Sequence, residues 1–109
     1  MSDKQIFIKV YVNDAVKSGL IADMGSERWA TLTALASYMN SNGICYPTVE
    51  SIAHALGVST STASRRIQRL AKYRFKGEPV IEIRNIREEG GQFGRNFYKI
   101  LPSSGVRIF

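Results

Sequence analysis

The segment 46–70 constrains the fold most strongly, because it contains two helical patterns separated by a single glycine. Thr48 follows a proline and is a suitable N-cap for the first helix. Gly57 ends that helix, since the residue after a helix end often needs a positive φ. The apolar face of this first helix consists of Ile52, Ala53 and Leu56.

The second helix can begin after Ser59, whose hydroxyl is a good N-cap. Its apolar residues recur at i, i+4 and i+7, which is the spacing of one buried helical face. These residues are Ala63, Ile67 and Leu70. Two short helices with a small residue and a glycine at their crossing predict a helix-turn-helix, which we place at residues 48–74.

The opposite face of the second helix is polar and basic. An exposed helix of this kind fits the major groove of DNA, where Arg can bind guanine and Gln can bind adenine. We therefore expect five residues to read bases. They are Thr60, Ser61, Ser64, Arg65 and Gln68. The alternative is an ordinary solvated helix surface.

The distribution of charge favours a polyanionic partner. The chain has 109 residues, 44% of them hydrophobic, and a net charge of +6. Residues 1–59 carry a net charge of −1 and residues 77–109 carry +1, whereas residues 60–76 contain six basic residues and no acidic residue. The excess positive charge thus lies on and just after the second helix, as expected for a nucleic-acid-binding protein.

Other kinds of site are poorly supported by the sequence. The single cysteine, Cys45, excludes an intrachain disulfide and is more consistent with a small buried residue than with a reactive thiol. The single histidine, His54, leaves no ligand set for zinc. We find no catalytic residue set, metal site or cofactor motif, and we expect no enzyme activity. We see neither a signal peptide nor a membrane-length apolar run, so we expect a cytoplasmic protein.

The segments before the helix-turn-helix predict one strand and two helices. Residues 5–12 are rich in β-branched and aromatic residues and predict a strand. This strand either caps the sheet of the C-terminal β-hairpin, the wing described below, or pairs with another protomer. A short helix is expected to reach Lys17. A longer helix is expected at residues 27–40, with Ser26 as its cap and Trp29 in the core.

The segment after the helix-turn-helix predicts a β-hairpin wing at residues 79–101. Its strands are residues 80–86 and 96–101, joined by a glycine-rich loop at residues 87–94. Arg87 and Arg95 are expected to contact the DNA backbone. The predicted fold is α+β and mainly α: a winged helix-turn-helix domain of residues 1–101, with a core of three to four helices, an N-terminal strand and a C-terminal wing.

The last eight residues, 102–109, are treated as a tail. Two alternatives stay open for them: an extra strand or docking segment, or the cut edge of a longer chain.

Several motifs together resemble a family of winged helix-turn-helix domains. These domains occur in plasmid and phage replication initiators, in primosome-type replication proteins and in related bacterial regulators. The motifs are Trp29-x-x-Leu32, Asn42-Gly43-Ile-Cys-Tyr-Pro47-Thr48, Ile52-Ala53, Leu56-Gly57-Val58-Ser59, Thr62-Ala63-x-Arg65-x-Ile67-x-x-Leu70 and Asn96-x-Tyr98. The resemblance implies that Thr48 and Ser59 lie near phosphates and that Arg69 and Lys72 bind the DNA backbone.

Two features depart from the family pattern. Arg66 occupies a position that is often apolar, so either its stem lies along the core with its charged head exposed, or the neighbouring surface is wet. We expect Arg66 to contact the DNA backbone. The glycine usually found soon after the recognition helix is absent, which sets the wing back.

The predicted function is double-stranded DNA binding in plasmid or phage replication or maintenance. The alternatives are a transcriptional regulator of the same fold, and a winged helix that contacts a replication or transcription partner protein. A homodimer is a further expectation, with the Phe7–Val12 strand as the candidate interface.

Overall fold

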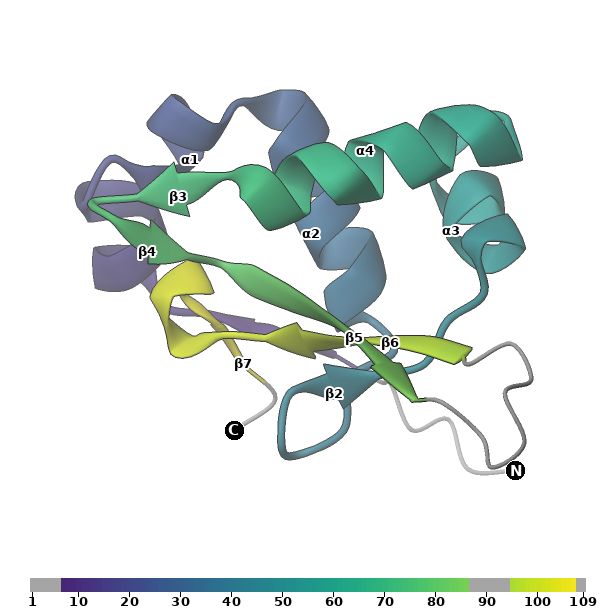
Figure 1. Ribbon diagram of the computed structural model, residues 1–109. Helices are drawn as coiled ribbons and strands as arrows, with labels where there is room; N and C mark the ends of the chain where they lie inside the picture. The colour runs from purple at the N-terminus through teal and green to yellow at the C-terminus, as the bar shows by residue number, and fades with distance from the viewer. Residues whose placement is uncertain (1–6, 87–94, 108–109) are drawn as a thin grey trace, which may run out of the picture.

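The computed structural model describes residues 7–86 and 95–107, with the side chains of residues 85, 86 and 95 excluded. Three main helices precede the C-terminal strands, so the fold is α+β and mainly helical, as predicted, and is consistent with a winged helix-turn-helix (Figure 1). The helices are α1 (Leu20–Met24), α2 (Ser26–Ala36), α3 (Val49–Leu56) and α4 (Thr60–Lys72), with a π-helical turn η1 (Asn13–Lys17) and a 3-10 helix η2 (Pro102–Ser104). The strands are β1 (Lys9–Val10), β2 (Ile44–Cys45), β3 (Arg74–Phe75), β4 (Glu78–Pro79), β5 (Ile81–Ile86), β6 (Arg95–Ile100) and β7 (Val106–Arg107).

One hydrophobic core joins the helices to the sheet. Its buried side chains come from all four α-helices and from the strands β2, β5, β6 and β7, and they include Leu32, Ile52, Ile67 and Ile81. The predicted stripe of α4 is confirmed, since Ala63, Ile67 and Leu70 are all buried. Trp29 is partly buried and packs against this core.

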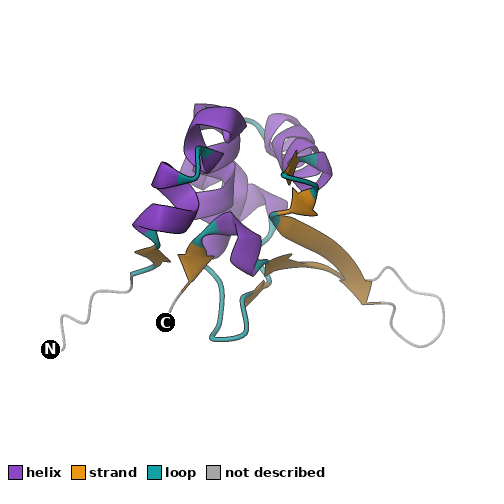
Figure 2. Ribbon diagram, turned by 90° about the vertical axis from the view of Figure 1, so that its left-hand side faces the viewer, coloured by secondary structure: helices purple, strands orange, loops and turns teal. Residues whose placement is uncertain are grey.

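The wing consists of β5 and β6 in antiparallel pairing, and β2 adds to the outer side of β6. Cys45 and Ile83 both lie opposite Tyr98 in this sheet. Figure 2 shows the hairpin extending away from the helices. The predicted strands are confirmed to within one residue, whereas the glycine-rich loop at 87–94 lies outside the described residues.

The predicted strand at residues 5–12 is wrong in length. Within the described residues, β1 contains only Lys9 and Val10. The chain leaves the strand at Tyr11, because the Tyr11 carbonyl accepts a hydrogen bond from the Ala15 amide at 2.8 Å and begins η1. Within the chain, β1 pairs with β7 and not with the wing.

Residues 102–107, the described part of the segment assigned to the tail, pack on the helical domain. After η2, β7 pairs with β1 in antiparallel register, with Val10 opposite Val106. Ser104 and Val106 are buried, and the Ser104 hydroxyl accepts a hydrogen bond from the Val106 amide. The structure therefore contains the extra strand that the sequence analysis considered for this segment.

The predicted helix at residues 27–40 ends four residues too late, because α2 ends at Ala36. Gly25, with φ of 86°, precedes α2, and Ser26 is the first helical residue rather than a side-chain cap. At the other end, the side-chain oxygen of Asn40 accepts hydrogen bonds from the amides of Asn42 and Ile44. These contacts organise the turn before β2, so Asn40 belongs to the turn.

The helix-turn-helix predicted at residues 48–74 extends two residues beyond the end of α4. The helix ends at Lys72, because Tyr73 has extended backbone angles. A short hairpin of β3 and β4 follows, with Lys76 and Gly77 both at positive φ in its turn. Two consecutive positive φ values are typical of a two-residue hairpin turn, and the sequence analysis did not anticipate it.

Candidate nucleic-acid interface

The turn between α3 and α4 has the predicted local geometry. The Thr48 hydroxyl oxygen accepts a hydrogen bond from the Ser51 amide at 3.0 Å and caps α3. Gly57 ends α3 with φ of 69° and ψ of 35°, a left-handed conformation that favours glycine. The Val58 amide then bonds the Ala53 carbonyl at 3.0 Å. Both the cap and the glycine stop are confirmed.

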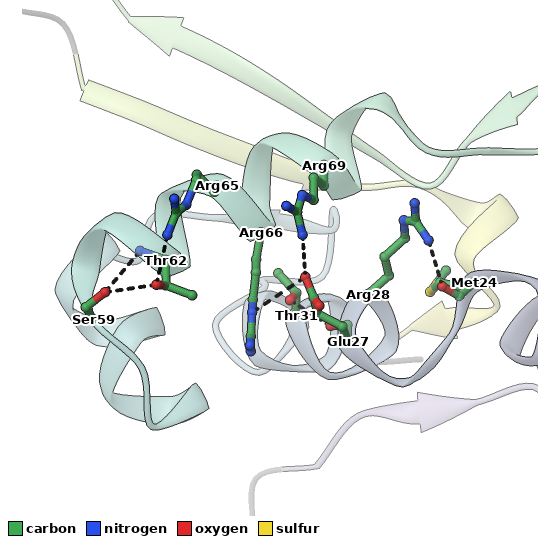
Figure 3. Close-up of polar contacts among 9 residues, drawn as sticks. All are labelled: Met24, Glu27, Arg28, Thr31, Ser59, Thr62, Arg65, Arg66 and Arg69. Atoms are coloured by element: carbon green, nitrogen blue, oxygen red, sulfur yellow. Dashed lines mark hydrogen bonds and ion pairs between the residues drawn. The ribbon is translucent and has the colours of Figure 1, made fainter.

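The start of α4 carries a chain of polar contacts (Figure 3). The Ser59 hydroxyl oxygen accepts a hydrogen bond from the Thr62 amide at 3.2 Å and donates to the Thr62 hydroxyl at 3.0 Å. Arg65 also donates to the Thr62 hydroxyl, at 3.3 Å. The N-cap therefore connects through Thr62 to the guanidinium of Arg65.

The five predicted base-reading residues are all exposed on α4. Thr60 is the first residue of the helix, and the other four lie on the side opposite the buried stripe. At 100° per residue, Ser61, Ser64, Arg65 and Gln68 fall within an arc of about 100° and span about 10 Å along the axis. Lys72 is exposed and continues the same arc toward the end of α4.

Two of the predicted backbone-binding arginines lie on a different side of α4. Arg66 and Arg69 point toward α2, where they meet Glu27 (Figure 3). The Arg69 guanidinium donates to the Glu27 carboxylate at 3.2 Å, and Arg66 Nε lies 3.6 Å from the same oxygen. The sequence analysis missed Glu27, because only the packing of α2 against α4 brings it to these arginines.

A second polar cluster secures the C-terminal end of α4. The Tyr73 hydroxyl donates to the Asp23 carboxylate at 2.6 Å, and the Arg28 guanidinium lies 5.2 Å from the centre of the Tyr73 ring. Partial burial and the contact with Asp23 raise the pKa of Tyr73 to about 12. Arg28 also donates to the Met24 carbonyl at 3.1 Å (Figure 3). These contacts join α1, α2 and the residue after α4.

The wing contributes an aromatic contact near the start of α3. Arg87 and the side chain of Arg95 lie outside the described residues. On the strand that carries Arg95, Phe97 stacks on Tyr46 with ring centres 5.6 Å apart. Tyr46 is 53% exposed and precedes Thr48 by two residues, so an aromatic surface adjoins the start of α3. The sequence analysis did not identify this pair.

The single cysteine is buried in the core and the single histidine is exposed to solvent. Cys45 is fully buried, as predicted, and burial raises the pKa of its thiol to about 12. His54 is exposed on α3. Among residues 7–86 and 95–107, no three His, Cys, Asp or Glu side chains come close enough to hold a metal ion. None of the described helices is long and apolar enough to cross a membrane.

Comparison with known proteins identifies the central part of this structure. Residues 30–75 match the family model of a helix-turn-helix domain, and this range contains most of α2 and all of α3 and α4. The chain therefore contains a helix-turn-helix domain, a class that is typically DNA-binding and not enzymatic. No curated protein and no solved structure was found to match the chain.

Proposed function

We propose that this helix-turn-helix protein binds double-stranded DNA by placing α4 in the major groove. The observation that carries the proposal is the exposed polar arc of α4, with Arg65 held above the first turn by Thr62. An α-helix fits the major groove, and about 10 Å of exposed polar helix suits a short half-site. Thr60, Ser61, Ser64, Arg65 and Gln68 are the proposed base-reading residues.

Backbone contacts are proposed at the two helix starts and along the edges of α4. Thr48 and Ser59 cap α3 and α4, and the free amides at such helix starts attract phosphate. Lys72 extends the exposed arc and is available to a phosphate. Arg66 and Arg69 flank the arc but are paired with Glu27 in the free protein. The wing arginines Arg87 and Arg95 complete the proposed set.

The biological role is proposed on the motif resemblance alone. We retain replication or maintenance of a plasmid or phage, with transcriptional regulation as the alternative. A homodimer would double the short half-site and would increase the specificity of binding. In the free protein, Phe7 and Val12 are 63% and 56% exposed beside β1, which supports this segment as the candidate contact.

The test is a fluorescence-anisotropy titration with a random duplex and with a pool of selected sequences, each at about 50 mM and 200 mM salt. DNA binding predicts steep salt dependence, and base reading predicts an enriched motif. Arg65→Ala should reduce the difference between matched and random duplexes. Lys72→Ala should weaken both equally and lower the salt slope by about one.

The outcomes distinguish the alternatives. Salt-dependent binding without an enriched motif would leave a non-specific DNA-binding protein. Absence of binding at low salt would refute the proposal and favour a winged helix that contacts another protein. The symmetry of an enriched motif would report whether one or two protomers bind.

A further inference from the structure

Glu27 is the acidic residue that most directly opposes the positive charge of α4. Its carboxylate oxygen lies 3.2 Å from Arg69 Nη1 and 3.6 Å from Arg66 Nε, so one carboxylate serves two guanidinium groups. Residues 60–76 themselves contain six basic residues and no acidic residue. The group of three side chains therefore presents a net charge of +1 rather than +2.

The position of Glu27 is set by the packing of α2. It lies in the first turn of this helix, and its backbone carbonyl accepts a hydrogen bond from the Thr31 hydroxyl at 2.9 Å. Thr31 is fully buried, which anchors this turn to the core. Figure 3 shows the carboxylate directed from α2 toward α4 and both arginines directed toward it.

The three side chains remain open to solvent to different degrees. The Arg69 side chain is 63% exposed, Glu27 is 45% exposed and Arg66 is 27% exposed. An exposed ion pair is worth little, so an approaching phosphate can compete with the carboxylate. Arg69 is the more exposed of the two arginines and is better placed to change partners.

We propose that Glu27 sets the affinity for DNA by competing with phosphate for Arg66 and Arg69. This inference rests on the proposed function. In the free protein the carboxylate neutralises part of the α4 charge, and on binding a phosphate takes its place beside Arg69. Glu27 then regains solvent cations, which offsets part of the counterion release that drives binding. Glu27 thereby weakens binding to every duplex by a similar factor.

The test uses Glu27→Gln, which keeps the size of the side chain and removes its charge. The pairing energy of an exposed ion pair predicts that this variant binds random duplex about 1.5- to 5-fold more tightly than the wild type. The slope of log affinity against log salt should steepen by up to about 0.9, because one additional net counterion is released. Matched and random duplexes should gain equally.

Two controls identify the cause. Asp14→Asn removes the same charge from an exposed position on η1, so it reports the effect of net charge alone. The second control repeats Glu27→Gln in a protein that already carries Arg66→Gln and Arg69→Gln. If Glu27 acts through the arginines, its substitution gives no further gain in that background.

The possible results separate this inference from the function on which it rests. Tighter binding by Glu27→Gln, a smaller effect of Asp14→Asn and no gain in the arginine-free background would support the competition. Unchanged or weaker binding, or a gain that persists without the arginines, would overturn it while wild-type DNA binding stands. Absence of binding by the wild type would overturn the proposed function and this inference together.

Discussion

Substitutions of Ser59, the N-cap of α4, can change two properties separately: the stability of the helix and the charge at its N-terminus. Its hydroxyl oxygen accepts the Thr62 amide at 3.2 Å and donates to the Thr62 hydroxyl at 3.0 Å. Ser59→Ala removes both contacts and should lower the free energy of unfolding by about 1 kcal/mol. For a domain of this size the midpoint of thermal unfolding should fall by about 4–8 °C.

Ser59→Asp should have the opposite effect on stability. A carboxylate can accept the same amide, and it lies at a helix N-terminus whose first turn contains no acidic residue. The interaction with the helix dipole adds about 0.3–1 kcal/mol of stability relative to a neutral cap. Urea denaturation should therefore rank Ser59→Asp at or above the wild type and Ser59→Ala below both.

The ranking of Ser59→Ala and Ser59→Asp should be reversed when DNA affinity is measured instead of stability. If Ser59 faces a phosphate, the new carboxylate adds a repulsion of about 1 kcal/mol at a separation of about 4 Å in water, or about a fivefold loss of affinity. Ser59→Ala, measured where it is fully folded, should bind much more tightly than Ser59→Asp.

A matched control isolates the effect of position. Asn13→Asp adds the same charge on η1, which lies at the opposite end of the molecule from the start of α4 (Figure 1). It should therefore change DNA affinity much less than Ser59→Asp. Equal affinities for Ser59→Asp and Asn13→Asp would refute the placement of Ser59 near DNA, and a Ser59→Asp variant no more stable than Ser59→Ala would refute the cap argument.

Three further predictions concern the rest of the fold. In urea denaturation, Gly43→Ala should destabilise the protein more than Gly57→Ala. Both glycines have positive φ, so both substitutions incur about 1–2 kcal/mol of backbone strain. In addition, a Cβ at Gly43 would lie 2.7 Å from the Ile100 carbonyl oxygen, whereas a Cβ at Gly57 meets nothing within 4 Å. Cys45 should react with a thiol reagent at pH 9 only after unfolding, because burial raises its pKa to about 12; rapid reaction of the folded protein would contradict this. The pKa of Tyr73 is likewise raised to about 12 from an ordinary value of 10.0, so its contribution to stability should be complete below pH 10 and lost as pH rises toward 12; Tyr73→Phe should lower stability by about 1 kcal/mol at neutral pH and reduce this alkaline loss.

The helix-turn-helix could be predicted because its determinants are local. The hydroxyl of Thr48 reaches an amide three residues away, and Ser59 does the same at the next helix. Gly57 supplies the conformation that the turn requires, independently of the rest of the chain. Interactions of this range are visible in the sequence pattern itself.

The missed features depend on pairings between distant segments. Glu27 and Arg69 are joined only when α2 packs on α4, and Asp23 meets Tyr73 only when α1 contacts the residue after α4. The strands β2, β3 and β4 have two residues each, which is too short for an alternating pattern to identify them. Residues 10–12 have strand-like side chains, yet a local hydrogen bond from Ala15 ends β1 after Val10.

The antiparallel pairing of β1 with β7 has a consequence for synthesis of the protein. Lys9 pairs with Arg107, so the first described strand must wait for almost the whole chain before its partner exists. At about 5–20 residues per second, this interval lasts roughly 5–20 s on the ribosome. During that time the edge of β1 is unpaired, next to the apolar side chains of Phe7 and Val12. An open strand edge beside apolar side chains is a site for association between nascent chains, so the yield of folded protein should depend on how quickly residues 102–107 follow.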